Sequence, residues 1–375
     1  MAKRNIDRTE PGDIMFAHPF DKWLYDLAVE VGEFNSQLRN KLQAYGEEDY
    51  QDWMDDIRIR LFASFPWPIG YEMQKLAVIE ANQSHHRLNQ ILRITEKALQ
   101  FVVHVMMIDL YDRNRQLAPS GKLLKFKAND FKSRFETTTI GNLVWLLQGQ
   151  VNIYKENKIE PFLEGIIPRL STPEFKKALE FVPPARNAVG HYRLDQNDWT
   201  LCNQIPDYLD KLFVILSAIS VVCRYTLVSV HDIAIEYNRY TGPAYIHKCK
   251  TLNTRRIELP AKTSRLCQYI HSHCVAIVSN SDDVSAKYLD LSPLIFDTDS
   301  YVQGLINGYE NERLRRTTKD IFIFTRLLRD DKLDYIGTRS TQEDYDRLDL
   351  TVLPFYDDLL NELKKLIESL APVAA

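Results

Sequence analysis

The stretch that decides the fold is RITEKALQFVVHVMMIDLYDR, residues 93–113. Apolar side chains recur at intervals of three and four through it and just before it, which is typical of one buried helix face. These apolar residues are Leu88, Ile91, Leu92, Leu99, Val102, Val103, Met106 and Leu110. The polar residues largely outside this face are Arg93, Glu96, Lys97 and Gln100. The pattern predicts a long helix from about residue 85 to 115.

Other helices are predicted on both sides of this one. Near the N-terminus, helical spacing is shown by Trp23, Leu24, Leu27, Ala28 and Val31. The run FPWP at 65–68 indicates a rigid break. Helices are expected at about 140–155 and 172–182, the second opened by Ser171 or Thr172 as cap with Pro173 at its first position. A long buried helix is expected at about 204–238.

After Tyr240 the pattern changes to short runs with strand character. The expected strands are Val275–Val278, Tyr288–Phe296, Ile321–Leu328 and Leu333–Ile336, with a hairpin turn at 329–332 and a last helix at about 355–370. The predicted fold class is mainly α, a helical bundle with a C-terminal α+β module that contains a small antiparallel sheet. Three regions are expected: a helical segment at 1–84, a helical domain at 85–240, and an α+β domain at 241–375 that regulates or binds a partner.

Composition excludes several classes of protein. The chain has 375 residues, a formal net charge of −4 and only 13 glycines. A net negative charge argues against a protein that coats nucleic acid generally, so any such contact must come from local patches. No glycine-rich phosphate loop of the Walker or dinucleotide type is present, which disfavours a kinase, an NTPase or a dehydrogenase.

The cysteines and the apolar runs favour a cytoplasmic protein. Five cysteines and a polar N-terminal sequence, MAKRNIDRTEPGD, indicate free thiols and no signal peptide. The longest apolar run, 212–230, approaches membrane-spanning length but contains Arg224 and three serines. A buried helix therefore explains it better than a membrane span, and no membrane association is expected.

The segment RNAVGH, residues 186–191, carries the candidate chemistry. Cleavage of RNA by internal transesterification needs a base near the 2′-hydroxyl, a cation beside the phosphate and protonation of the leaving group. His191 can exchange a proton near neutral pH, and Arg186 can hold phosphate oxygens. Asn187 can orient either group. The pattern suggests phosphodiester chemistry without a metal or another cofactor.

The expected position of this segment is a helix N-terminus, because Pro183 and Pro184 favour helix initiation. Such a position would add free backbone donors and the positive end of the helix dipole. On a regular helix, however, Arg186 and His191 lie about 140° apart around the axis. One copy would then be an incomplete site, and two copies related by a two-fold axis would complete it.

With these surroundings the chain resembles the HEPN superfamily (higher eukaryotes and prokaryotes nucleotide-binding domain), whose pattern is Arg, four to six residues, then His. Here a long first helix, RITEKALQFVVHVMMIDLYDR, precedes a short TIGNLVWLLQ helix, the RNAVGH motif and a closing apolar helix. The resemblance covers about residues 85–235. It implies an all-helical bundle that dimerises through the motif helices. It also implies a metal-independent endoribonuclease of a toxin–antitoxin or phage-defence system, whose products carry a 2′,3′-cyclic phosphate.

By this resemblance Arg186 and His191 would be catalytic, Asn187 would support them, and Glu96 on the first long helix would orient Arg186. The partners implied are an RNA substrate, a second copy of the chain and an antitoxin or other defence protein. An alternative stays open: a non-catalytic HEPN module that binds nucleotide, RNA or protein as a sensor, or as a subunit of a larger defence complex.

Two further groups of residues have open interpretations. The basic segment 122–134 is interleaved with Phe126 and Phe131, and either contacts an RNA backbone or is a solvated connector. Its cations are Lys122, Lys125, Lys127, Lys132 and Arg134. The histidines and cysteines between 247 and 274 lack the paired spacing of zinc sites. Buried thiols are the favoured interpretation, and no metal is expected.

Overall fold

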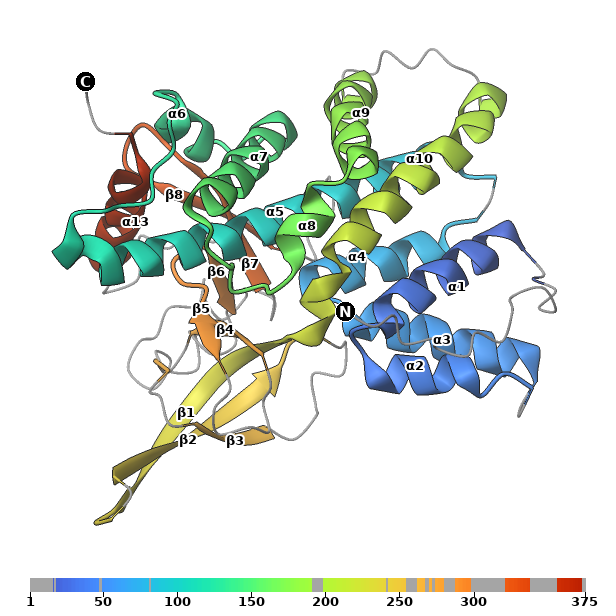
Figure 1. Ribbon diagram of the computed structural model, residues 1–375. Coiled ribbons are helices and arrows are strands. Elements are labelled where there is room, and N and C mark those ends of the chain that lie inside the picture. The colour runs from blue at the N-terminus through green and yellow to red at the C-terminus, as the bar shows by residue number, and fades with distance from the viewer. Residues whose placement is uncertain are drawn as a thin grey trace, which may run out of the picture.

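The structure is a computed structural model that describes most of the chain (Figure 1). The described residues are 16, 18–46, 49–80, 82–190, 198–240, 242–253, 262–266, 270–271, 274–279, 287–297, 321–337 and 356–372. Side chains at 187–190, 198–202, 238 and 262–266 are not described. The fold is mostly helical, with antiparallel sheet in the C-terminal part.

Helices make up most of the described residues before Thr226, and one more helix lies near the C-terminus. The helices are α1 (Pro19–Gly32), α2 (Ser36–Gln43), α3 (Tyr50–Ser64), α4 (Trp67–Val78), α5 (Ser84–Leu117), α6 (Phe131–Phe135), α7 (Ile140–Asn157), α8 (Ile166–Leu170), α9 (Pro173–Gly190), α10 (Asp198–Ile219) and α13 (Tyr356–Leu370). Short 3-10 helices are η2 (Ala118–Ser120) and η3 (Ser220–Arg224). The predicted helices near residues 23–31, 85–115, 140–155 and 355–370 are confirmed, as is the break at 65–68.

The strands form two antiparallel sheets. They are β1 (Thr226–Asn238), β2 (Gly242–Thr251), β3 (Lys262–Leu266), β4 (Val275–Val278), β5 (Tyr288–Asp290), β6 (Ile295–Asp297), β7 (Ile321–Leu327) and β8 (Leu333–Gly337). The order is β3-β2-β1-β4-β5 in one sheet and β6-β7-β8 in the other. The predicted β7–β8 hairpin is confirmed, whereas the single strand expected at 288–296 is two short strands in different sheets.

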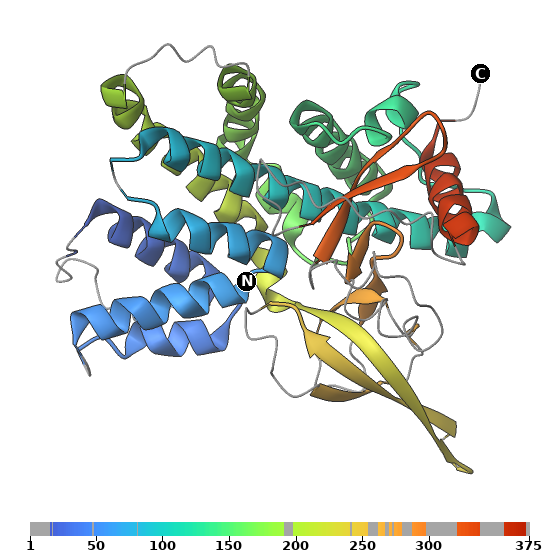
Figure 2. The same cartoon turned by 180° about the vertical axis from the view of Figure 1, so that it is seen from behind.

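Helix α5 is the centre of the packing. One large apolar core runs from Leu24 to Leu370 and includes α1, α5, α7, α10, both sheets and α13. Seen from behind, β7, β8 and α13 lie against the C-terminal part of α5 (Figure 2). Asn114 of α5 joins two other segments at this end, because its side chain donates to Leu124 O (2.9 Å) and to Ser369 O of α13 (3.1 Å). The C-terminal elements therefore cover the same long helix as the N-terminal ones.

Helix α9 begins where the sequence predicts and ends later. Thr172 Oγ1 accepts from Phe175 N (3.3 Å), with Pro173 at the first position, so the predicted cap is confirmed. The helix then continues through Pro183 and Pro184 to residue 190. The prediction of a new helix start at these prolines was wrong. The flanking apolar residues Val182 and Ala185 are buried, and this packing offsets the hydrogen bonds that the prolines cannot donate.

The helix predicted at 204–238 is wrong in its second half. α10 ends at Ile219, η3 follows, and Thr226 begins strand β1. β1 pairs with β2 from Val228 to Asn238, so the expected domain boundary near 240 falls inside a hairpin. Of the described helices, none combines the length and the apolar character that a membrane span requires.

Candidate functional site at the end of helix α9

Arg186 lies in the last turns of α9, where that helix packs against the first part of α5. Ala185, the residue before it, is buried in a small apolar cluster with Leu88 and Leu92 of α5. Phe181 and Tyr208 pack edge to face on the same cluster, with ring centroids 4.8 Å apart. These contacts fix the rotation of α9, and they turn Arg186 toward the polar side of α5.

The structure brings Arg186 and Glu96 together. Arg186 Nε lies 3.6 Å from Glu96 Oε2, and each side chain is 34% exposed. The carboxylate holds the guanidinium at one place while leaving part of it accessible. The predicted proximity of these two residues is therefore confirmed, while their roles in catalysis stay predictions.

A small pocket of about 90 Å³ surrounds this ion pair. It lies between α5, the end of α9 and strand β8, and its lining residues are Asn89, Leu92, Arg93, Glu96, Lys97, Arg186 and Ile336. Three of the lining side chains are cations and one is a carboxylate. The charge of the lining suits an anionic group such as a phosphate.

Arg93 is anchored in this pocket by a buried carboxylate. Its Nε lies 3.2 Å from Oε1 of Glu72, a residue of α4 with no exposed surface. The same carboxylate lies 3.3 Å from Lys75 Nζ and accepts from Gln90 Nε2 at 2.7 Å. Because Glu72 is shared among these partners, Arg93 is held in position by α4 rather than by α9.

Lys97 connects the pocket to the C-terminal sheet. It is almost fully buried, and its Nζ donates to Gln100 Oε1 at 3.2 Å. Gln100 Nε2 in turn donates to Phe324 O of β7 at 2.8 Å. The polar side of α5 is therefore in contact with both α9 and the β6-β7-β8 sheet.

The expected helix N-terminus at the motif is absent, and this changes the electrostatics. Arg186 and the backbone of 187–190 form the carboxyl end of α9. The carboxyl end of a helix carries partial negative charge, which favours cations rather than anions. Backbone amides of α9 therefore cannot form the predicted anion site there.

Two of the predicted catalytic residues are not placed by these contacts. Asn187 belongs to α9, but its side chain lies outside the described residues. His191 also lies outside the described residues. Their roles stay predictions.

The basic segment 122–134 lies elsewhere, beside α7. Lys127 pairs with Glu156 at 2.7 Å and Lys132 lies 3.8 Å from Glu136 Oε1. Arg134 pairs with Asp130. Lys122 is exposed and Lys125 half-buried. None of these cations lines the pocket around Arg186.

The aromatic residues of that segment belong to the core. Phe126 and Phe131 are buried and stacked, with centroids 4.3 Å apart. Phe126 also stacks on Trp145, whose ring Arg134 covers at 4.8 Å. These rings are therefore not available to stack on RNA bases, and any RNA contact here would depend on the lysines alone.

The histidine and cysteine segment shows the expected buried thiols. Among the described residues, no group of three His, Cys, Asp or Glu side chains is arranged to hold a metal. Cys249 and Cys274 lie in a small apolar cluster, and burial raises the pKa of the Cys274 thiol well above its usual range. His247 Nε2 accepts from Ile270 N at 3.1 Å. Cys267 and His273 lie outside the described residues.

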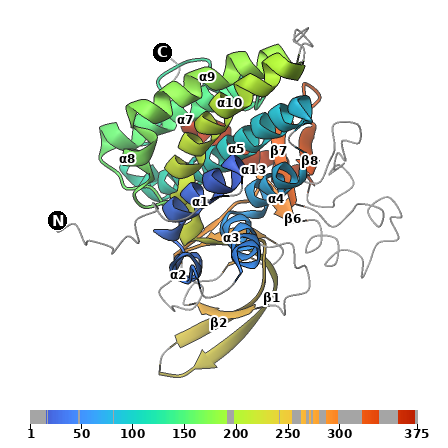
Figure 3. The ribbon, with the colours of Figure 1, turned by 90° about the vertical axis from the view of Figure 1, so that its right-hand side faces the viewer.

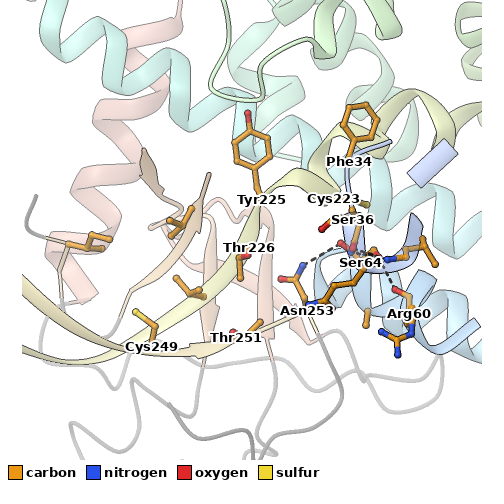
Figure 4. A pocket seen from close by; sticks show the side chains of 17 residues that line it. Phe34, Ser36, Arg60, Ser64, Cys223, Tyr225, Thr226, Cys249, Thr251 and Asn253 are labelled. Atoms are coloured by element: carbon orange, nitrogen blue, oxygen red, sulfur yellow. Dashed lines mark hydrogen bonds between the residues drawn. The ribbon is translucent and has the colours of Figure 1, made fainter. Parts of the chain in front are cut away.

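A larger cavity of about 440 Å³ lies between α2, α3 and the five-stranded sheet (Figure 4). Three of its polar side chains already make hydrogen bonds within the cavity wall. Asn35 Nδ2 donates to Ser64 Oγ (2.8 Å), Ser64 Oγ donates to Arg60 O (2.7 Å), and Asn253 Nδ2 reaches Ser64 O (3.4 Å). Burial raises the pKa of the Cys223 thiol, so this lining thiol is protonated at neutral pH. These groups join the helices to the sheet.

Sequence reasoning missed Arg93 and Lys97 as residues of the candidate site. The available signal was the polar spacing 89, 93, 96, 97 and 100, which follows a second face of α5. No sequence signal pointed to Glu72, because its role depends on how α4 packs on α5.

Comparisons of this chain with protein-family models, with curated proteins and with solved structures found no match.

Proposed function

We propose that this protein is a metal-independent endoribonuclease of HEPN type. The observation that carries the proposal is the Arg186–Glu96 pair in a pocket with Arg93 and Lys97. A guanidinium held by a carboxylate and still partly accessible can bind the scissile phosphate through two hydrogen bonds. Arg93 adds a second fixed cation beside it.

The reaction proposed is internal transesterification. The 2′-oxygen attacks the phosphorus, the bond from phosphorus to the 5′-oxygen breaks, and the products are a 2′,3′-cyclic phosphate and a 5′-hydroxyl. A proton leaves the 2′-hydroxyl and another reaches the 5′-oxygen. His191 would serve as the proton donor and acceptor, because an imidazole can exchange a proton near neutral pH.

The site would be composite, formed by two copies of the chain. In the sequence Arg186 and His191 are five residues apart, a spacing that does not place two residues on one face of a helix, so each would act with its counterpart from a second copy. In this arrangement Asn187 would orient the imidazole or the phosphate. The biological setting that the family resemblance suggests is a toxin or phage-defence system, and a partner such as an antitoxin belongs to the same proposal.

The test is cleavage of total RNA by the pure protein in the presence of EDTA. We expect Arg186→Ala and His191→Ala to lower the rate by about 100-fold or more, because each removes a group that acts on the reacting phosphodiester. Arg115→Ala is the matched control. Arg115 lies at the other end of α5 with its side chain 66% exposed, and its loss should leave the rate unchanged.

Two results would contradict the proposal. One is a His191→Ala variant that cuts as fast as the unchanged protein. The other is an unchanged protein that binds RNA without cutting it, which would favour the non-catalytic binding module.

Mixing the two inactive variants tests the composite site. Heterodimers of Arg186→Ala and His191→Ala would contain one intact Arg and one intact His. We expect the mixture to cut RNA faster than either variant alone. An unchanged rate after subunit exchange would argue that each site is built from one chain.

A further inference from the structure

Strands β1 and β2 form an arm that extends away from the rest of the molecule. Figures 1 and 3 show this ribbon at one end and helices α9 and α10 at the other. Beyond Val230 only β2 pairs with β1 among the described residues, so no described strand lies along the second edge of β1 there, called the open edge below. An open strand edge is a template for pairing with another strand.

The outer half of β1 also presents apolar side chains to solvent. Ile235 is 62% exposed and Tyr237 is 79% exposed, which are high values for large apolar residues. Ile233 is half-buried on the same face, since it lies two residues away in the strand. Exposed apolar side chains along an open edge mark an interaction surface.

The backbone hydrogen bonds show which residues face the open edge. Near its start, β1 directs Leu227 O to Leu252 N, just after β2 (2.7 Å), and Val230 N to Cys274 O on the other side (3.0 Å). Successive residues of a strand direct their backbone groups to opposite edges. In this part of β1, therefore, odd-numbered residues face β2.

A β-bulge between Val230 and Asp232 reverses this alternation. Leu252 directs its N–H to β1, and backbone groups alternate between the two edges of a strand, so Lys248, four residues away, also faces β1. The residue paired with Lys248 is Asp232. Asp232 therefore faces β2. It follows that Ile233, Ile235 and Tyr237 direct their N–H and C=O groups to the open edge, and that their side chains share one face.

We propose that a second copy of this chain binds here, with the two β1 strands antiparallel and Ile235 on the two-fold axis. In this register Ile235 faces its own counterpart, and Ile233 faces Tyr237 of the second copy. All the outward backbone groups of these three residues are then paired, and the apolar side chains form one continuous stripe across the axis.

Charge selects this register over its neighbours. With Ile235 on the axis, Glu236 faces Ala234 of the second copy, and no two acidic residues oppose each other. If the two-fold axis moves to Ala234, Asp232 lies opposite Glu236 of the second copy. If the axis moves to Glu236, that residue lies opposite its own counterpart. Like charges directly opposite in a sheet are destabilising, so both shifted registers are disfavoured.

This arm interface is independent of RNA cleavage and lies at the end of the molecule away from helix α9, which carries Arg186 (Figure 3). It would join copies whether or not the ends of α9 also meet. The residue pattern predicted a helix at 204–238, so the proposal depends on the strand pairing described above.

The test is the mass of the full chain in solution, measured by light scattering after gel filtration. We expect Ile235→Lys to halve the mass, because two ammonium groups would then meet on the axis. Ala234→Lys is the matched control on the opposite face of the same exposed strand. Its lysine would face Glu236 of the second copy, so the mass should not change. A monomeric unchanged protein, or an Ile235→Lys variant of unchanged mass, would overturn the proposal.

Cross-linking tests the register itself. In a hydrogen-bonded antiparallel pair the Cα atoms are about 5.5 Å apart, within the range that a disulfide spans. Ile235→Cys should therefore form a covalent dimer under mild oxidation. Tyr237→Cys should not, because its two copies would lie about 14 Å apart. Cross-linking of the second variant in preference to the first would contradict the register.

Discussion

Helix α5 buries polar side chains in two stretches that differ in how well those side chains are paired. In the first, between Gln90 and Gln100, hydrogen bonds and ion pairs join α5 to α4, α9 and β7. In the second, around His104, both imidazole nitrogens have no partner among the described residues. The same holds for Oε1 of Gln150, a residue of α7 whose Nε2 donates to Val103 O. Paired polar groups therefore mark the candidate site, whereas the second stretch is apolar packing that tolerates only a neutral histidine.

The largest effect on stability is expected where the first stretch is most deeply buried. Replacing Glu72 by Leu removes the carboxylate that Arg93, Lys75 and Gln90 share, and should lower the free energy of unfolding by about 3 kcal/mol. Denaturant unfolding measures this change. Glu80→Leu, at an exposed position just beyond α4, is the control and should change stability by less than about 0.5 kcal/mol. Equal effects of the two variants would show that the network does not stabilise the fold.

The contribution of His104 to the free energy of unfolding should depend on pH. Burial lowers the pKa of His104 to about 3, with Lys97 adding to the shift. The unfolded chain binds this proton near pH 6.5, so stability is complete above that pH and falls as the pH drops. The loss between pH 7 and pH 5 should be about 2 kcal/mol.

His104→Leu isolates this contribution. We expect the variant to lack this part of the pH dependence and to be at least as stable as the unchanged protein at pH 7, since no hydrogen bond is lost among the described residues. Unfolding of both proteins at the two pH values gives the difference. Identical pH profiles would show that His104 can be protonated in the folded state.

A smaller effect is expected at the link between α5 and the sheet. Gln100→Met keeps the size of the side chain but removes the donor to Phe324 O and the acceptor of Lys97 Nζ, which together should cost about 1.5 kcal/mol. Gln148→Met, at an exposed position on α7, is the matched control. If both variants unfold at the same denaturant concentration, these hydrogen bonds contribute nothing measurable.

The smallest effect on stability should be at the candidate site itself. Both side chains of the Arg186–Glu96 pair are partly exposed, so Glu96→Gln should lower stability by only about 0.5 kcal/mol. If Glu96 positions Arg186, the same variant should cut RNA more slowly than the unchanged protein. A large loss of stability together with unchanged cleavage would mean that the pair serves the fold and not the reaction.

The sequence predicts helices well where the apolar period is long. α5, α7 and α13 follow directly from it, and the β7–β8 turn is confirmed with Asp331 at φ 59°. Two of the errors have clear physical reasons. Prolines 183 and 184 are start signals, but packing of their neighbours extends α9 through them. An apolar run such as 212–230 is compatible with a buried helix or a buried strand, so the change at Thr226 could not be located.

The candidate site was predictable only in part. Arg186 and Glu96 could be paired from residue type and family resemblance, and the structure brings them together. Arg93 could not be assigned, because its position depends on Glu72 from a different helix. Long-range partners of this kind arise from tertiary packing, which the residue pattern of a single helix does not contain.

The contacts between α13 and α5 can form only late in synthesis of the chain. Synthesis proceeds from the N-terminus, so α5 leaves the ribosome more than 200 residues before Ser369 and Leu370. Asn114 and Phe126 bond to the carbonyls of those two residues. Until they emerge, the apolar side of α5 that α13 covers stays open to solvent and to chaperones. A ribosome that stalls before it reaches Tyr356 would therefore release a chain whose central helix lacks this cover.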